Sequence, residues 1–165
     1  MRTRGFTLIE VLVVVVILAV LASALVLSTA SSGERRLERE AEKLRALVAY
    51  ACEQAELRGR EIGVSLNSGG YRFSEFDRDA WVGFSDGELR PRTWLAGTDA
   101  MLSRDGHTVE VAAQFPDKPQ LLCFSSGELT PFRLELALGE IAVRYRLDGD
   151  PGGAVALTTL SDRAH

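Results

Sequence analysis

Histidine is scarce in this chain, which limits the catalytic chemistry available to it. The 165 residues include two histidines, His107 and His165. A serine or cysteine triad would have one weak candidate base, His107, because His165 is terminal. No Cys/His spacing of the zinc-binding type is present either. We therefore expect no enzyme, no metal and no cofactor.

Cysteine is equally rare, with only Cys52 and Cys123 in the sequence. The two could pair if this part of the chain lies outside the cytoplasmic membrane. Two cysteines so far apart do not define a disulfide framework, however. Two buried thiols are the interpretation that we favour, and a bridge is the alternative.

Basic residues do not outnumber acidic ones, since 19 Lys and Arg face 23 Asp and Glu for a formal net charge of −4. An acidic chain argues against binding nucleic acid through a basic patch, so no nucleic-acid partner is expected. The sequence also lacks internal repeats and low-complexity tracts. Beyond an apolar N-terminal segment, the remaining length is enough for one compact domain.

One long apolar segment, residues 11–30, carries no formal charge. As a helix it would be about 30 Å long, the thickness of the hydrocarbon core of a bilayer. Arg2 and Arg4 precede it, so the positive-inside bias places the extreme N-terminus in the cytosol and the remaining chain outside. A signal peptide cleaved after residues 21–24, Leu-Ala-Ser-Ala, is a weaker interpretation, because the apolar run continues through Leu27.

Glu10 is the residue that a plain membrane anchor does not explain. A carboxylate in the apolar part of a span costs about 2.5–3.5 kcal/mol, so it is by default a functional hypothesis with a partner. Facing an ammonium group, it would recover much of that loss and give register to packing between apolar helices. Gly5 has no side chain, so the backbone there is open to close approach by another molecule.

Residues 5–10, Gly-Phe-Thr-Leu-Ile-Glu, resemble the signature of type IV pilins and type II secretion pseudopilins. The resemblance implies that a prepilin peptidase cuts between Gly5 and Phe6 and that the new N-terminal Phe6 is N-methylated. It also implies that Glu10 faces the N-terminal amine of a neighbouring subunit during filament assembly.

After the apolar segment, helical periodicity resumes and is then replaced by strand periodicity. Apolar residues recur at three- and four-residue intervals over residues 34–57, which predicts an amphipathic helix that covers a sheet. Ser31 to Gly33 is the expected place for a bend. Ile62, Val64 and Leu66, then the turn 67–70, predict a hairpin. Further strands are expected at 81–84, 88–95, 108–112, 120–125, 131–136, 141–147 and 154–160.

The predicted fold class is α+β, with a long N-terminal helix packed on antiparallel sheets as in pilins. Four parts are expected: residues 1–5 as leader, 6–30 as transmembrane and assembly helix, 31–58 as its amphipathic continuation and 59–165 as a periplasmic β-rich head. Residues 123–136, which begin Cys-Phe-Ser-Ser-Gly-Glu-Leu, are similar to a strand-turn-strand of H-type (GspH-like) minor pseudopilins and of the related FimT and FimU minor pilins. Residues 58–64 and 70–73 resemble the same group.

Two motifs that suggest other chemistry are set aside. Residues 83–87, Gly-Phe-Ser-Asp-Gly, fit a hydrolase nucleophile elbow, but Glu88 and Pro91 follow where a helix is required. Asp148 and Asp150 could supply oxygen ligands for calcium, yet the short Asp-Gly-Asp-Pro-Gly-Gly run lacks a full ligand set.

The resemblance therefore implies a structural function, a minor pseudopilin at or near the tip of the periplasmic pseudopilus of a type II secretion system. The implied partners are other major and minor pseudopilins, the prepilin peptidase, the inner-membrane assembly platform and membrane lipid. The alternative is a minor pilin of a type IV pilus or DNA-uptake filament. A distant alternative is a membrane-anchored periplasmic hydrolase in which Ser85 and His107 would converge.

Overall fold

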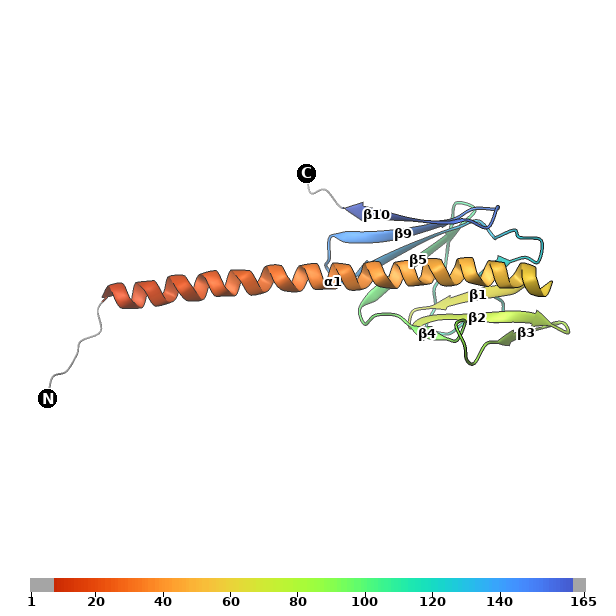
Figure 1. The fold of residues 1–165 in the computed structure, drawn as a ribbon, viewed down its shortest axis with the longest axis horizontal. Helices are drawn as coiled ribbons and strands as arrows, with labels where there is room; N and C mark the ends of the chain where they lie inside the picture. The colour runs from red at the N-terminus through yellow and green to blue at the C-terminus, as the bar shows by residue number, and fades with distance from the viewer. Residues whose placement is uncertain (1–7, 162–165) are drawn as a thin grey trace.

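A single long helix leads into the folded part of the chain. The computed structural model describes the backbone of residues 8–161, and the side chains of residues 8–20 and 32–161. Helix α1 runs without a break over Leu8–Arg58, 51 residues, which corresponds to a length of about 75 Å. Its N-terminal half projects from the head, and its C-terminal half lies along it (Figure 1). The helix continues through Ser31 to Gly33, where the sequence suggested a bend.

The first sheet follows α1 directly and begins with a hairpin. Strand β1 (Ile62–Asn67) pairs antiparallel with β2 (Gly70–Asp77), and Asn67 lies opposite Gly70 across a two-residue turn. Strand β3 (Ala80–Gly83) and the short β4 (Arg92–Thr93) both pair with β2, and β7 (Leu121–Cys123) pairs with β1. The hairpin predicted from alternation and the Asn-Ser-Gly-Gly turn is confirmed.

The second sheet has the order β10-β9-β8-β5-β6 and is antiparallel throughout. Its strands are β5 (Thr98–Arg104), β6 (His107–Val109), β8 (Phe132–Leu138), β9 (Val143–Gly149) and β10 (Val155–Ser161). Asp105 and Gly106 have positive φ angles of 50° and 77° and close the two-residue turn between β5 and β6. Asp-Gly is the preferred sequence for such a turn.

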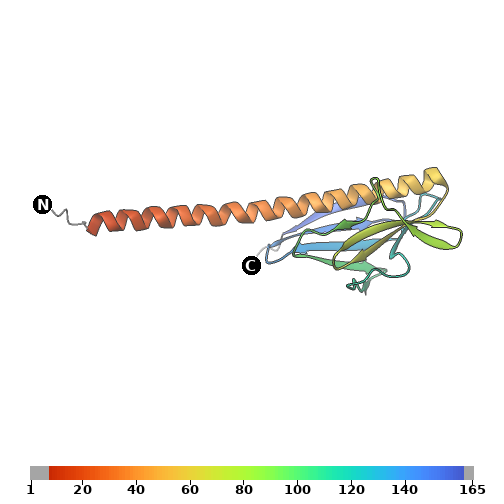
Figure 2. The same cartoon turned by 90° about the horizontal axis from the view of Figure 1, so that it is seen from below.

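Helix α1 lies over the junction between the two sheets, so that one apolar stripe covers strands of both (Figures 1 and 2). The stripe that the sequence predicted is buried and consists of Leu37, Ala41, Leu44, Val48, Ala51, Cys52 and Ala55. Inward-facing side chains of the sheets, such as Phe73, Leu134 and Leu147, complete the core. The α+β class is therefore confirmed.

Gly33 has a packing role instead of the expected bend. A Cβ atom built on it would lie 2.6 Å from Cδ1 of Ile141, which is in the connection between β8 and β9. Real Cβ atoms essentially never approach another heavy atom so closely. The missing side chain therefore lets the helix lie close to the second sheet.

Cys52 and Cys123 form a disulfide, in place of the two buried thiols that we favoured. The bond joins the C-terminal part of α1 to β7, across a sequence separation of 71 residues. Both cysteines are buried in the core. Sequence spacing could not reveal the pairing, because it depends on how the helix lies over the first sheet.

Two strand predictions are wrong in instructive ways. Of residues 88–95, only Arg92–Thr93 pairs with a neighbour, because Pro91 lacks an N–H and the Arg90 and Arg92 guanidinium groups bond back to the carbonyls of Gly87 and Glu88. Strand β5 was missed although it lies between β8 and β6. Only Ala100 and Leu102 supply its inward apolar pattern.

Candidate assembly site

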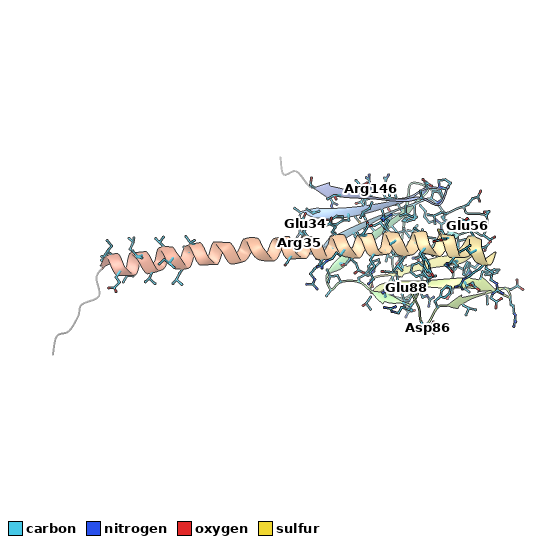
Figure 3. The ribbon with its side chains drawn as sticks, in the orientation of Figure 1. Glu34, Arg35, Glu56, Asp86, Glu88 and Arg146 are labelled. Atoms are coloured by element: carbon cyan, nitrogen blue, oxygen red, sulfur yellow. A yellow bond between two sulfur atoms is a disulfide. The ribbon has the colours of Figure 1, made fainter. Side chains whose placement is uncertain are left out.

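Residues 8–20 of α1 present apolar side chains to solvent (Figure 3). Leu8 is 84% exposed, and even Val14 is 47% exposed. A helix that is hydrophobic all round is normally buried, and burying one Val or Leu side chain fully is worth about 1.5–3 kcal/mol. Contact of residues 8–20 with other apolar helices or with lipid would therefore stabilise the protein.

Glu10 lies in the first turn of α1 and is exposed among these apolar residues. The partial positive charge of a helix N-terminus favours a carboxylate at this position. The partner predicted for Glu10, an N-terminal amine, belongs to another subunit. Gly5 and Phe6, the predicted cleavage and methylation residues, lie outside the residues that the structure describes.

The expected membrane span, residues 11–30, is helical along its length. Among the described residues, no helix is long and apolar enough to cross a membrane. The side chains of residues 21–31 are not among those described.

Ion pairs fix the far end of α1 against the first sheet. Arg58 Nη1 and Arg60 Nη1 lie 3.1 and 2.8 Å from the two carboxylate oxygens of Glu75 on β2. The Glu75 carboxylate raises the pKa of Arg60 above its ordinary value. Along the exposed face of the helix, the hydrogen bond from Arg45 lowers the pKa of Glu42. That pair fits the solvated charged face predicted for the helix.

The hydrolase alternative has no support in the arrangement of its two residues. Ser85 follows β3 at an edge of the first sheet, whereas His107 begins β6 at an edge of the second. No helix follows residues 83–87, so the nucleophile-elbow geometry is missing in this described part of the chain. His107 Nδ1 lies 3.0 Å from the carbonyl oxygen of Asp105, within its own turn.

The acidic run at the end of β9 is engaged in other contacts. The Asp148 carboxylate accepts hydrogen bonds from Arg133 Nε at 3.0 Å and Arg146 Nε at 2.8 Å. Asp150 Oδ1 accepts one from the backbone N–H of Ala154 at 3.2 Å. Among the described residues, no group of three or more His, Cys, Asp or Glu could hold a metal ion.

Sequence reasoning missed a group of cations that converge on the head. Lys43 of α1, Arg90 of the loop before β4 and Arg92 of β4 line one hollow. Lys43 lies 47 or more positions before the two arginines along the chain. The local Arg-Pro-Arg at 90–92 is the only sequence signal that points to this group.

Comparisons with known families agree with this layout. A model of the prokaryotic N-terminal methylation motif matches residues 1–26. A model of type II transport protein GspH matches residues 40–153, which is more than half of the chain.

Named relatives extend the likeness over most of the length. The chain is 38% identical to type II secretion system protein H of Pseudomonas aeruginosa over 146 residues, 82% of this chain and 83% of that protein. It is 29% identical to the Aeromonas hydrophila protein of the same name, over 87% of this chain and 86% of that protein.

Among solved structures, the minor pseudopilin EpsH of the Vibrio cholerae type II secretion system matches with a TM-score of 0.64 at 21% identity. The match covers 79% of this chain and 98% of the EpsH chain. A solution structure of Escherichia coli GspH gives a TM-score of 0.57 at 20% identity, over 78% of this chain and 90% of that one. These likenesses show the fold.

Proposed function

The chain belongs to the GspH family of type II transport proteins and is a minor pseudopilin of a type II secretion system, and we propose that it is incorporated at or near the tip of the periplasmic pseudopilus. The observation that carries this proposal is the exposed apolar run at residues 8–20 of α1, with Glu10 in its first turn, on a head of the GspH family. Exposed apolar residues of this kind are stabilised when the helices of other subunits cover them.

Processing precedes assembly in this proposal. The prepilin peptidase cuts between Gly5 and Phe6, and Phe6 is then N-methylated. The match of residues 1–26 to the methylation motif supports this step. Glu10 then pairs with the N-terminal amine of a neighbouring subunit, which offsets the cost of placing a carboxylate among apolar helices.

Other pseudopilins and the prepilin peptidase are the partners that follow from the family. We extend this set to the inner-membrane assembly platform and to membrane lipid around residues 11–30 before assembly. The N-terminus is then cytosolic before processing, and the head is periplasmic.

The protein acts as a structural subunit, like its pseudopilin relatives. The relatives named above are type II secretion proteins, which favours the secretion pseudopilus over the alternative of a minor pilin in a type IV pilus. In this proposal the protein contributes to export by assembling into the filament, and it catalyses no reaction on a substrate.

Substitution of Glu10 tests the assembly proposal. We expect Glu10→Gln to be cleaved normally but to give at least about tenfold less crosslinking to partner pseudopilins in intact cells, because the charge pair is lost. Glu53→Gln, an exposed glutamate on the head-covering part of α1, is the matched control and should crosslink like the wild type. Unaltered crosslinking of Glu10→Gln removes Glu10 from the mechanism.

Substitution of Gly5 tests processing separately. We expect Gly5→Val to accumulate as precursor, because a branched side chain hinders approach of the peptidase to the backbone. Mass spectrometry of the purified chain reads the mature N-terminus, which should begin at Phe6 in the wild type and before Phe6 in the variant. Thr3→Val is the control within the leader. Normal cleavage of Gly5→Val would refute the assigned cleavage site.

A further inference from the structure

A hollow of about 530 Å³ lies between α1 and β4, and its charged lining is entirely basic. Lys43, Arg90 and Arg92 line it, and no carboxylate is among its described lining residues. We call it the cationic hollow. It is unexpected on a chain whose formal net charge is −4.

The walls of the cationic hollow are held by a dense set of hydrogen bonds. Trp94 donates from Nε1 to the carbonyl of Asn67 at 2.9 Å and from its backbone N–H to Gly69 at 3.0 Å. A Cβ atom at Gly70 would collide with the carbonyl oxygen of Arg92. Glycine is thus needed where β4 approaches β2, and the hollow is formed before any partner arrives.

Its positive charge is only partly neutralised. Within the described part of the chain, Lys43 makes no ion pair. Arg90 Nη1 donates to the Gly87 carbonyl at 2.8 Å, and Arg92 Nη2 donates to the Glu88 carbonyl at 3.0 Å. Arg92 Nη2 also forms a loose ion pair with Glu88, at 3.7 Å, and the Glu88 side chain is 70% exposed. Each guanidinium has five N–H donors, so both can bind a further acceptor.

An apolar wall accompanies the cations. Pro91 and Phe115 also line the cationic hollow. The Phe115 ring is held under the Arg72 guanidinium, 4.6 Å from the ring centroid, and Arg72 Nη2 bonds to the Pro116 carbonyl at 3.3 Å. A free inorganic anion would leave this wall unused, whereas a peptide segment brings both a carboxylate and apolar atoms.

The position of the cationic hollow suits a contact between subunits. Strand β1 runs back along α1, so its last residue, Asn67, lies beside Lys43 instead of at the tip of the helix. Figure 1 shows β4 and this end of β1 beside the head-covering part of α1, whereas β9 and β10 extend closer to the N-terminal half of the helix. Subunits that pack side by side through the exposed apolar residues of α1 bring a neighbouring head within reach of this flank.

We propose that the cationic hollow binds a carboxylate-bearing segment of a neighbouring pseudopilin, an acidic side chain or the C-terminal carboxylate. The proposal rests on the assembly function above and names the chemistry of one contact within it. Lys43 and Arg90 bind the carboxylate, Arg92 adds a fixed positive charge, and Phe115 packs against the apolar part of the segment.

The test uses the full-length chain in cells that contain its secretion system. A photocrosslinking amino acid replaces the exposed Thr93 at the rim of the cationic hollow, and mass spectrometry identifies the attached peptide. We expect adducts with another pseudopilin in a peptide that contains Asp, Glu or the chain's C-terminus. The double charge reversal Lys43→Glu/Arg90→Glu should lower their yield by about tenfold or more.

Controls separate this contact from folding and from assembly in general. Arg78→Glu/Lys118→Glu reverses two exposed cations that do not line the hollow and should leave the Thr93 adducts unchanged. A second crosslinker at the exposed Val13 reports assembly through α1 and should give adducts in both double variants. If the Val13 adducts are absent from the wild type as well, the assembly function itself fails.

Two results overturn the proposal while leaving the assembly function intact. One is a Thr93 adduct yield that charge reversal does not change. The other is an adduct with lipid or with peptides that lack a carboxylate, while Val13 adducts persist. Recovery of the Thr93 adducts when the mapped acidic residue of the partner is changed to Lys, in the background of the reversed hollow, would confirm the pairing.

Discussion

Tyr71 is a buried residue whose hydroxyl is not used by the fold. It is fully buried on β2, and its ring packs at a centroid distance of 4.8 Å from Trp94 and 6.0 Å from Phe73. Its hydroxyl oxygen has no hydrogen-bond partner among the described residues. Burial raises the pKa of Tyr71 above its ordinary value, and the charge of Glu40 adds to that rise. The ring contributes packing, and the hydroxyl carries an uncompensated desolvation cost.

We therefore expect Tyr71→Phe to leave the free energy of unfolding unchanged or to raise it by up to about 1 kcal/mol. Urea unfolding of the detergent-solubilised chain measures this, and Tyr50→Phe, at an exposed position on α1, is the control. The pKa is higher in the folded state, so the wild type should lose stability as pH rises above about 10, and the variant should lose less. A loss of more than about 1 kcal/mol at neutral pH would show that the hydroxyl has a partner.

Functional residues differ in how far the sequence reveals them. Gly5, Phe6 and Glu10 are predicted from one short motif, because in the proposed function a peptidase and a neighbouring amine would recognise a local stretch of chain. Lys43 and Arg90 meet only after α1 is laid beside β4, so no local pattern contains them.

At the scale of elements, α1 is one continuous rod whose contact with the second sheet depends on Gly33. Gly33→Leu would add a side chain whose Cβ atom lies 2.6 Å from the present position of Ile141 Cδ1. The clashing atom is the end of a flexible, half-buried side chain that can move aside, so the cost falls at the low end of the about 1–3 kcal/mol typical of overpacking. We expect Gly33→Leu to lower the free energy of unfolding by that amount, measured as a lower urea midpoint. Adding Ile141→Ala to the same chain should restore part of the lost stability.

The alternative for this position is a flexible hinge. A hinge would require Gly33 for backbone freedom, so Ile141→Ala would not improve Gly33→Leu. If Gly33→Leu alone leaves the urea midpoint unchanged, the close approach of α1 to Ile141 does not require glycine at position 33.

Elements with strong periodicity were predictable, and elements defined by their neighbours were not. The α1 stripe and the β1–β2 hairpin follow from apolar spacing and turn residues alone. Strand β5 presents few apolar residues and is a strand because β8 and β6 pair with both of its edges. Residues 88–95 have the opposite character, with strand-like composition but a proline and arginine side chains that close a loop.

At the scale of the whole molecule, a disulfide links α1 to the first sheet in addition to the backbone. The disulfide between Cys52 and Cys123 closes a loop that contains strands of both sheets, from β1 to β6. In the chain-entropy account, closing a loop of this length stabilises the folded state by about 4 kcal/mol. The head is small, so this is a large share of the 5–15 kcal/mol typical of a folded domain.

We expect Cys52→Ala/Cys123→Ala to lower the free energy of unfolding by about 4 kcal/mol, with further loss from the cavity left in the core. Urea unfolding with and without reductant separates the two contributions, because reductant should destabilise the wild type and leave the double variant unchanged. A wild-type midpoint that is insensitive to reductant, with both thiols open to alkylation after unfolding, would mean that the cysteines are not joined. Since oxidation to a disulfide is favoured outside the cytoplasm, an oxidised pair in cells also supports a periplasmic head.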